Sequence, residues 1–439
     1  MMKKEINAKM EDIISLCKRR GFIFQGSEIY GGLAGTWDYG HLGLALKNNI
    51  KNIWWKRFVT DREDMYGVDA AILMNQKVWQ ATGHVGGFSD PLAECKKCKK
   101  RFRADQLKDP KKCAECGGEM GEPRQFNMML KTHVGAIEDD TSISYLRPET
   151  AQGMFVNYKN IIDSYHPKLP FGMAQIGKAF RNEIAPRDFT FRSREFEQME
   201  IEYLVKPEEW KDSFEHFRIE MSNYIKEIGL KSEHVYEQEI SDEDRAFYSK
   251  RTIDFEFEFP FGRQELYGLA YRTDYDLKRH SDSSKVDLGY LDEESKSRFT
   301  PHCIEPSFGV DRSVLAVICD AYTEDELGGE KRIYMKFNPS VAPIKIAVFP
   351  LLKNKPQLVE KAREVYTNLK KEFGNVMFDD NGNIGKRYRR QDEIGTPYCV
   401  TVDFETIEKD GMVTVRDRDS GNQERVKIED LKEYFKKHF

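Results

Sequence analysis

The spacing of apolar residues along the chain alternates between a helical period and a strand period. Residues 11–60 carry apolar side chains at helical spacing on both sides of the glycine-rich segment GSEIYGGLAGTWDYGHLG, which predicts a loop leading into a long helix. The runs GMAQIGKAFRNEI and EFEQMEIEYLV flank the polar segment APRDFTFRSR within residues 172–205. This arrangement predicts two long antiparallel strands joined by a charged loop.

The next segments repeat this change of period. A charged helical pattern over residues 207–250 predicts a helical insertion, and the run TIDFEFEFPFGRQELYGLAYRTDYDL then alternates as strands do. In SFGVDRSVLAVICDAY one helical stripe collects apolar side chains, namely Val310, Val314, Val317 and Ala321. We therefore expect a buried helix that packs on the sheet.

The proline-containing segment NPSVAP separates these elements from a second unit. Beyond it the patterns predict a strand, a helix over 360–373, a strand, a helix over 385–394, a strand, a hairpin and a final helix. The chain is thus expected to hold a larger unit over 1–338 and an independent α/β domain over 342–439.

Composition narrows the classes of function. Charged residues make up 33% of the 439 residues, the mean hydropathy is -0.67, and no apolar run reaches the roughly 18 to 20 residues that a membrane span needs. The opening MMKKEINAKMEDIISLCKRRGF lacks the apolar core and cleavage site of a signal peptide. We expect a cytoplasmic protein without a membrane span. The net charge of -5 argues against a general DNA or RNA coat protein, so any nucleic-acid contact is expected to be local.

Four of the eight cysteines form two CxxC pairs, CKKC and CAEC, separated by fourteen residues within segment 92–122, which reads as an inserted module. This spacing is close to that of zinc ribbons and predicts a structural Zn²⁺ bound by Cys95, Cys98, Cys113 and Cys116. Because four thiolates fill a tetrahedral site, the metal is expected to be architectural and not catalytic. A redox dithiol or free thiols are the alternative. The other four cysteines are expected to be buried thiols: Cys17, Cys303, Cys319 and Cys399.

The predicted hairpin carries the first chemical signal. Residues i and i+2 share a strand face, so AFRNEI would place Arg181 beside Glu183, with Asn182 on the opposite face. On the return strand, Phe196, Gln198 and Glu200 share one face, while Met199 and Ile201 share the opposite, apolar face. An amphipathic hairpin with a solvated charged face is the simplest interpretation of this pattern.

The connecting turn favours a more specific interpretation. Its arginines, which flank Phe189 and Phe191, are Arg187, Arg192 and Arg194. Such a cluster suits phosphate binding and stacking on a base, because a planar guanidinium binds phosphate oxygens in pairs and stays charged. A further arginine, Arg312, opens the predicted buried helix within GVDR.

These stretches resemble a known family. FRNEIAPRDFTFRSREFEQME resembles motif 2 of class II aminoacyl-tRNA synthetases, and EPSFGVDRSVLAVICDAY resembles their motif 3. The resemblance implies two catalytic arginines, with Arg181 on the α-phosphate of ATP and Arg312 on the γ-phosphate. It also implies an adenine contact from Glu183, a stack from Phe196, and Mg²⁺ bound with ATP, for which Glu265 is a candidate ligand. The ATP-binding set that it assigns is Arg181, Asn182, Glu183, Phe191, Arg192, Ser193, Arg194, Glu195, Phe196, Glu265, Leu266, Gly309, Val310, Asp311 and Arg312.

Four further runs restrict the resemblance to one family within class II. This resemblance extends over nearly the whole chain. LRPETAQG, FEQMEIEYLV, ELYGLAYRTDYDLKRH and EPSFG are similar to those of glycyl-tRNA synthetases. The resemblance implies activation of glycine with ATP to glycyl-adenylate and pyrophosphate, then transfer to the 3′ end of tRNA(Gly). A tight pocket lined by Glu149, Glu200, Glu305 and Ser307 would exclude larger amino acids without editing. The assigned glycine-binding set is Arg103, Glu149, Phe196, Glu197, Gln198, Met199, Glu200, Glu305, Pro306, Ser307, Phe308 and Gly309.

The resemblance also implies the architecture and the partners. We expect an α+β fold: a class II catalytic domain over 1–338, built on an antiparallel sheet flanked by helices, with a zinc-ribbon-like insertion, followed by an α/β anticodon-binding domain over 342–439. A homodimer is implied, with no DNA and no membrane partner. One departure is WDYGHLG, where relatives commonly read YDYGPLG, so that His41 stands near the motif 1 dimer region.

Two basic segments are candidates for tRNA contact. In the C-terminal domain, basic residues surround Tyr388 and are expected to bind the anticodon, with Arg416 and Arg418 as helpers: Lys386, Arg387, Arg389 and Arg390. At the first cysteine pair the basic residues are expected either to meet the acceptor stem or to form a solvated loop: Lys96, Lys97, Lys99, Lys100 and Arg101.

Two alternatives stay open. Threonyl-, prolyl- and histidyl-tRNA synthetases share the class, but the glutamate-lined pocket and EPSFG argue against them. A synthetase-like nucleic-acid-binding protein without catalysis would be expected to lose Arg181, Glu183 or Arg312, and this chain has all three.

Overall fold

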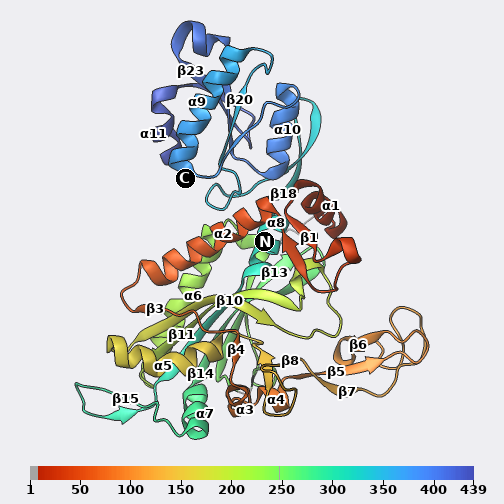
Figure 1. Cartoon of the computed structure of the whole chain (residues 1–439), viewed down its shortest axis with the longest axis vertical. Coiled ribbons are helices and arrows are strands. Elements are labelled where there is room, and N and C mark those ends of the chain that lie inside the picture. Colours follow the sequence, from red (N-terminus) through yellow and green to blue (C-terminus); the bar gives the residue numbers. More distant parts are fainter. Residues whose placement is uncertain (1–7, 247) are drawn as a thin grey trace.

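The structure is a computed structural model that describes residues 8–246 and 248–439. Its centre is a seven-stranded sheet in the order β12-β13-β14-β17-β11-β10-β3 (Figure 1). All neighbours pair antiparallel except β10 and β3. The strand bounds are β3 Met65–Gly67, β10 Phe171–Phe180, β11 Glu195–Val205, β12 Val235–Glu239, β13 Arg251–Phe259, β14 Gly262–Thr273 and β17 His302–Gly309.

Helices cover both faces of this sheet (Figure 1). On one face, α2 (His41–Trp55), α6 (Trp210–Glu227) and α8 (Val310–Ala321) pack on the main apolar core, which includes Met199 and Ile201 of β11. On the other face, α5 (Ala151–Tyr165) and α7 (Tyr275–Ser284) form a smaller core. The predicted buried stripe of α8 is confirmed, because Val310, Val314, Val317 and Ala321 are all buried.

The hairpin of β10 and β11 is confirmed, but one of its predicted strands is shorter than expected. β10 ends at Phe180, which pairs with Glu195, so Arg181 and Glu183 belong to the connection and not to a strand. The chain departs there because the Asn182 amide donates to the Met128 carbonyl oxygen at 2.7 Å, outside the sheet. The expected sharing of a strand face by Arg181 and Glu183 is therefore wrong.

The segment 207–250 differs from the expected helical insertion. Only α6 is a long helix, and the chain then passes through a 3₁₀ turn, η5 (Ser232–His234), into strand β12 at the edge of the main sheet. The first two residues of β12 are half-buried and its last three, Glu237, Gln238 and Glu239, are exposed. An edge strand with one solvated face carries the same charged composition as a surface helix, so the pattern did not separate the two.

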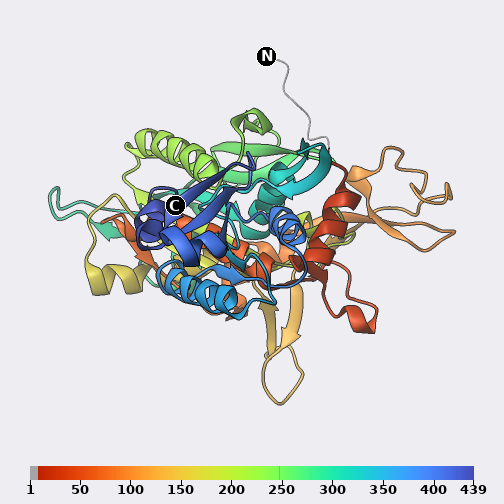
Figure 2. The same cartoon turned by 90° about the horizontal axis from the view of Figure 1, so that it is seen from above.

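Small elements surround the polar face of the sheet. The cysteine module is a three-stranded sheet of β5 (Ser89–Glu94), β6 (Arg101–Arg103) and β7 (Arg124–Asn127), and it projects from the body of the molecule (Figure 2). Beside it lies a second small sheet in the order β4-β9-β8, with strands at Leu73–Met74 (β4), Ile143–Leu146 (β9) and Leu130–His133 (β8). The other short elements are α1 Met10–Arg20, β1 Ile23–Gln25, η1 Glu28–Tyr30, β2 Trp37–Tyr39, η2 Lys56–Thr60, α3 Gln76–Ala81, α4 His84–Gly87, η3 Ala104–Gln106, η4 Phe189–Phe191, β15 Tyr290–Leu291 and β16 Arg298–Phe299.

The C-terminal unit follows the predicted order of elements. A five-stranded sheet in the order β21-β20-β22-β23-β24 holds strands at Ile346–Pro350 (β20), Val376–Phe378 (β21), Tyr398–Val402 (β22), Met412–Asp417 (β23) and Gln423–Lys427 (β24). Its other elements are α9 Pro356–Phe373, α10 Ile384–Ile394, η6 Thr406–Asp410, η7 Ile428–Asp430 and α11 Leu431–Lys436. A separate apolar cluster of strand valines and α9 residues forms its core.

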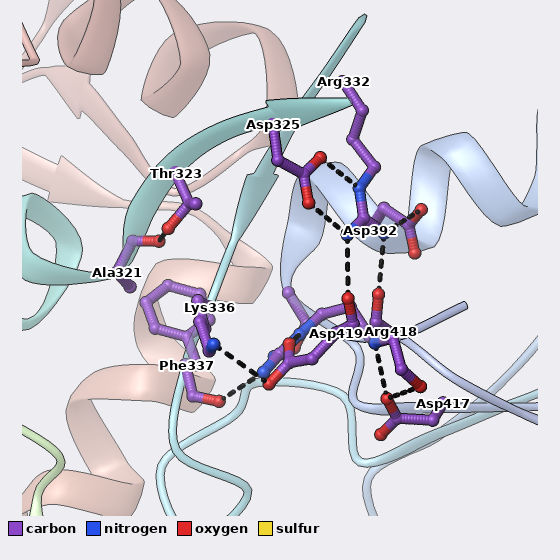
Figure 3. A network of polar contacts seen from close by, with 12 residues as sticks. Ala321, Thr323, Asp325, Arg332, Lys336, Phe337, Asp392, Asp417, Arg418 and Asp419 are labelled. Atoms are coloured by element: carbon purple, nitrogen blue, oxygen red, sulfur yellow. Dashed lines mark hydrogen bonds and ion pairs between the residues drawn. The ribbon is translucent and has the colours of Figure 1, made fainter. Parts of the chain in front are cut away.

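A β-hairpin that the pattern did not predict joins the two units. β18 (Tyr322–Leu327) and β19 (Glu330–Met335) extend from the end of α8 toward α10. Arg332 of β19 is buried and donates to Asp325 at 2.8 and 2.7 Å and to Asp392 of α10 at 3.2 Å (Figure 3). Arg418 donates to the Phe337 carbonyl oxygen at 2.9 Å. A buried ion pair between Arg332 and Asp392 and the hydrogen bond of Arg418 thus hold the C-terminal unit against the end of the larger one.

A second junction feature is a cavity of about 500 Å³ between α1, α2, α9 and α10. His41 is exposed at the first position of α2 and lines this cavity. Across the described residues, no helix combines the length and the apolar character required to cross a membrane.

Candidate active site

A cavity of about 360 Å³ opens at the ends of β11 and β17. The connection after β10 and the cysteine module complete its wall. Fifteen of the residues assigned from the sequence line it: Arg103, Arg181, Glu183, Phe191, Arg192, Ser193, Phe196, Glu197, Gln198, Glu265, Leu266, Ser307, Gly309, Asp311 and Arg312. Segments separated by more than two hundred residues of sequence therefore meet at one site.

Two arginines are fixed in this cavity by aromatic rings and carbonyl oxygens. The Arg181 guanidinium lies 5.4 Å from the Phe88 ring centre and 5.3 Å from that of Phe196, and its Nε donates to the Pro148 carbonyl oxygen at 3.1 Å. The Arg312 guanidinium lies 4.4 Å from the Phe191 ring centre. Stacking holds each planar group while leaving N–H donors for an anion.

The position of Arg312 follows from the start of α8. Its neighbour Asp311 is buried and accepts hydrogen bonds from Tyr39 Oη at 2.5 Å, Lys47 Nζ at 3.0 Å and the Glu197 amide at 2.6 Å. The Asp311 carboxylate thereby links α8 to α2, β2 and β11. Since its oxygens are occupied, Asp311 serves to fix this corner of the cavity.

Acidic residues complete the wall around the arginines. Arg312 donates to the carbonyl oxygen of Glu265 at 3.0 Å and lies 3.2 Å from its carboxylate, and Arg312 lowers the pKa of Glu265. Glu183 is buried and accepts from Arg192 at 3.3 Å. Behind Glu265, burial raises the pKa of Asp254 to about 7, assisted by the negative charges of Glu265 and of another glutamate on β13.

Behind the cavity floor lies a group of buried carboxyl groups on the α5 and α7 side of the sheet. Glu200 accepts hydrogen bonds from Thr150 Oγ at 2.5 Å, from Ser307 Oγ at 2.8 Å and from Gln198 Nε2 at 3.3 Å. Gln198 and Ser307 line the cavity, whereas Glu200 stands behind them. The floor of the cavity is therefore polar and is oriented by a buried acid.

Glu149 and Glu305 flank Glu200 and differ in their partners. Glu149 lies 3.4 Å from His84 Nε2; burial opposes ionisation, but His84 and the other donors lower the pKa of Glu149. Glu305 accepts from Arg272 at 2.6 Å; burial nevertheless raises the pKa of Glu305 above its usual value, against the opposing effect of Arg272. Burial and the charge of Glu149 also raise the pKa of Glu200. Within this wall the pKa of Glu149 is thus lowered, whereas the pKa values of Glu200 and Glu305 are raised.

Arg272 is the buried cation of this wall. It is 1% exposed and donates through Nε and Nη2 to Asp276, at 2.8 Å in both cases, and through Nη1 to Glu305. The sequence assigned it no role, although it lies in the quoted run ELYGLAYRTDYDLKRH. Arg272 lies on β14 and Asp276 on α7, so the helical pairing rule could not have predicted their contact.

Ten residues assigned from the sequence do not line the cavity. Glu195 is exposed and pairs with Lys178 at 2.8 Å, and Arg194 donates to the carbonyl oxygens of Glu183 and Ala34. The remaining eight are core side chains, carboxyl groups behind the floor, or backbone neighbours: Glu149, Asn182, Met199, Glu200, Glu305, Pro306, Phe308 and Val310. Met199, Phe308 and Val310 belong to the main apolar core, because strand alternation turns them away from the site.

Four cavity residues escaped sequence reasoning: Phe88, Asp90, Met128 and Thr190. Phe88 and Met128 border the cysteine module, where no periodic pattern marked a site. Asp90 holds Arg103 at 2.8 Å, and Asp105 holds it at 2.7 Å. This module therefore contributes to the cavity, and Arg103 lies in its wall as expected.

The four clustered cysteines meet as the CxxC spacing predicts. The Sγ atoms lie 3.6 Å apart for Cys95 and Cys116 and 3.7 Å apart for Cys98 and Cys113. A tetrahedral zinc with Zn–S distances of about 2.3 Å requires nearly the same sulfur separation. A Cβ at Gly118 would come within 3.2 and 3.3 Å of two of these sulfurs. The site thus fits a four-sulfur metal ion, and the other four cysteines are buried as expected.

The basic residues singled out for RNA contact are largely occupied by other partners. Arg387, Arg416 and Arg418 are buried; Arg416 donates to Asp392 at 2.8 and 3.0 Å, and Arg387 donates to backbone carbonyl oxygens. Arg416 pairs with Asp392 inside the C-terminal unit, and Arg418 donates across the junction to the Phe337 carbonyl oxygen. The predicted help of Arg416 and Arg418 in RNA binding finds no support in these buried positions and stays a prediction. Among the rest, the ion-paired residues are Arg389, Arg390, Lys96, Lys100 and Arg101.

Two family models match the chain. The family described as tRNA synthetase class II core domain (G, H, P, S and T) matches residues 136–322, which include β10, β11, β17 and α8. The family described as anticodon binding domain matches residues 345–438, which is the C-terminal unit.

Curated relatives match along almost the full length. A glycine–tRNA ligase of Clostridium acetobutylicum is 52% identical over 97% of this chain and 97% of its own length. A glycine–tRNA ligase of Lachnospira eligens is 51% identical over 98% and 99%, and one of Bacillus cereus is 50% identical over 98% of both chains. These matches therefore extend over both the unit that contains the cavity and the C-terminal unit.

Proposed function

The chain belongs to the glycine–tRNA ligase family of class II synthetases, and from this premise we propose that it activates glycine with ATP and transfers it to tRNA(Gly). The observation that carries the proposal is the cavity itself, where Arg181 and Arg312 stand above a floor of Gln198 and Ser307 backed by Glu200. The cavity thus combines cations that bind a polyphosphate with an acid that attracts an amino group.

ATP lies in the part of the cavity that holds the arginines. Arg181 binds the α-phosphate and Arg312 the γ-phosphate, while Phe196 and Glu183 receive the adenine. The glycine carboxylate attacks the α-phosphorus, the bond to the leaving oxygen breaks, and pyrophosphate departs. No general base is needed, since the nucleophile is already ionised; positioning and charge stabilisation lower the barrier.

Magnesium would enter with ATP. Glu265 is the fitting ligand, because the lowered pKa keeps its carboxylate ionised. When bound, the ion supplies neutralisation of the polyphosphate charge. Arg312, which contacts the same carboxylate, orients Glu265 toward the phosphate side of the cavity.

Glycine lies over the floor. Gln198 and Ser307 receive the ammonium group, and Arg103 neutralises the carboxylate. The carboxyl groups of Glu149, Glu200 and Glu305, which form a wall behind this floor, attract the ammonium charge. Since the wall consists of packed buried side chains, a side chain larger than hydrogen on the substrate meets occupied space. Steric exclusion of larger molecules is efficient, so the enzyme needs no editing site.

The other assignments extend this function. The four cysteines hold a structural Zn²⁺ that shapes the module carrying Arg103, and the C-terminal unit binds the anticodon of tRNA(Gly). We also propose a homodimer that works in the cytoplasm. Neither DNA nor a membrane is a partner.

Exchange of labelled pyrophosphate into ATP, without tRNA, tests the first step. We expect exchange with glycine and none above background with alanine, serine or threonine. A threonine signal would point to another synthetase of the class. Absence of exchange with every amino acid would favour a non-catalytic RNA-binding protein and would refute the proposal.

A further inference from the structure

One buried carboxyl group behind the floor has no role in the chemistry above. Glu202 of β11 is 0% exposed. Its Oε2 accepts a hydrogen bond from the Cys303 thiol at 2.9 Å. Its Oε1 has no hydrogen-bond partner within the described part of the chain. An ionised carboxylate in this position would leave an unsatisfied charged oxygen in the protein interior, which is costly.

The strand register explains why this position is crowded with acids. β11 and β17 are antiparallel, with Glu200 paired to Ser307 and Tyr203 paired to Ile304, which places Glu202 directly opposite Glu305. Carboxyl oxygens of Glu200, Glu202 and Glu305 all lie within 4.8 Å of one another. Like charges directly opposite each other on neighbouring strands repel.

The nearby cation relieves this repulsion only in part. Arg272 of β14 already gives Nε and Nη2 to Asp276 and Nη1 to Glu305. On the other side, β10 places apolar Met173 opposite Glu202. The charged or titratable groups that face Glu202 are therefore Glu200, Glu305, Cys303 and Arg272, and together they carry more acid than base.

We propose that Glu202 is an uncharged carboxylic acid at neutral pH, and that its proton lies between Glu202 Oε1 and the Glu305 carboxylate. A shared proton supplies the partner that Oε1 lacks and removes one of two opposed charges. Burial, reinforced by the charge of Glu305, raises the pKa of Glu202 well above its usual value, in keeping with this assignment. Three clustered carboxylates also suit a cation, but a bound cation would require Glu202 to be ionised.

Glu202 then acts as a positioning residue. Its hydrogen bond and the Arg272 guanidinium hold Glu305 from two sides, so that the acidic wall keeps its shape when no substrate is bound. This consequence rests on the proposed function, in which that wall receives the amino group of glycine. Loss of the donor would loosen glycine binding, while ATP binding, on the far side of the cavity, would stay unchanged.

Infrared difference spectroscopy tests the proton without any substrate. The spectrum of the wild type minus that of Glu202→Gln at pH 7 is expected to contain the carbonyl stretching band of a protonated carboxylic acid. A carboxylate band in its place would overturn the proposal, whether a cation or nothing neutralised it. Because neither glycine nor ATP is present, this outcome is independent of the proposed function.

A second variant keeps the test decisive if Glu202→Gln does not fold. In Cys303→Ala the thiol donor to Glu202 is lost, so the same carbonyl band of the otherwise unaltered acid is expected to move to higher frequency. Spectra of the wild type and Cys303→Ala that differ in no carbonyl band would contradict the assignment.

Steady-state exchange then tests the positioning role. Glutamine can donate from the same place, so Glu202→Gln is expected to keep the KM for glycine within about threefold, whereas Glu202→Leu, with no donor, raises it about tenfold. The KM for ATP is expected to stay the same in both variants. Equal large increases in the glycine KM for both variants would show that the negative charge of Glu202, and not its proton, is used.

Discussion

At the scale of single residues, Arg181 is held in a way that a lysine cannot imitate. Its guanidinium lies between the rings of Phe88 and Phe196 while Nε donates to a carbonyl oxygen. Arg181→Lys keeps the charge but loses the planar fork. We expect glycine-dependent pyrophosphate exchange to fall by about 10² to 10³ in kcat. Lys178→Arg, an exposed position on the same hairpin, is the control and should match the wild type; an unchanged rate in Arg181→Lys would remove Arg181 from the reaction.

Asp254 makes stability depend on pH. The pKa of this carboxyl group is raised from 3.8 to about 7 by burial and by Glu265. Between about pH 4 and pH 7 the unfolded chain loses this proton while the folded chain keeps it, so the folded state loses stability as pH rises. Asp254→Asn is expected to add about 1 to 2 kcal/mol above pH 7, after allowance for partial exposure, and nothing near pH 4.

Thermal unfolding at several pH values measures this effect. The gain in Tm of Asp254→Asn should grow from pH 4 to pH 7 and then stay constant. Asp242→Asn, at a side chain that is 90% exposed, is the matched control and should show little change at any pH. A gain of equal size at pH 4 and pH 8 would mean that ionisation of Asp254 is not the cause.

The types of residue in the motifs predicted more of the cavity lining than the expected strand geometry did. Alternation along a strand predicts that Arg181 and Glu183 share a face, and both do reach the cavity, but from a connection that begins after Phe180. The resemblance to motif 2 also assigned Glu195 to the ATP-binding set, but Glu195 is exposed to solvent. Phe88 and Met128 could not be predicted, because they reach the cavity by tertiary packing from a segment without periodicity.

At the scale of elements, long periodic segments were predicted well and short edge elements were not. The hairpin of β10 and β11, the helix α8 and the elements of the C-terminal unit lie where the patterns place them. β12 and the hairpin of β18 and β19 were missed because a solvated edge strand has the composition of a charged helix or loop. These missed elements complete the sheet edge and the junction between the units.

The cysteine module has only a small apolar core of its own. Its buried apolar cluster holds only a few residues around the cysteines. Cys95→Ser is expected to lower the zinc content of the purified protein from about one ion per chain to near zero. It should also expose the module to proteolysis. Cys399→Ser, at a buried cysteine far from the module, is the control; equal zinc in the wild type and Cys95→Ser would contradict the metal site.

At the scale of the whole molecule, Asp392 joins the two units through its buried ion pair with Arg332. Asp392 accepts from both Arg332 and Arg416, so Asp392→Asn weakens both contacts. The buried Arg416 loses its counter-charge, whereas Arg332 keeps Asp325. We expect the C-terminal unit to unfold at lower temperature, with a loss of about 3 kcal/mol or more. Charging of tRNA should fall about tenfold, while pyrophosphate exchange, which uses the distant cavity, stays near the wild-type rate.

Calorimetry and the two assays on one preparation separate these effects. Glu330→Gln changes an exposed pair on the same β-hairpin, with Arg389, and should leave both activities intact. Equal losses of exchange and charging in Asp392→Asn would show that the junction supports the catalytic unit itself.

The identity of the amino acid attached to tRNA tests the central claim most directly. The purified enzyme is incubated with ATP, Mg²⁺, unfractionated tRNA and an equimolar mixture of the twenty amino acids, and the acylated 3′-terminal adenosine is released by nuclease and weighed by mass spectrometry. The account predicts glycyl-adenosine as the only product above background. Any other aminoacyl-adenosine as the main product, or none, would contradict it.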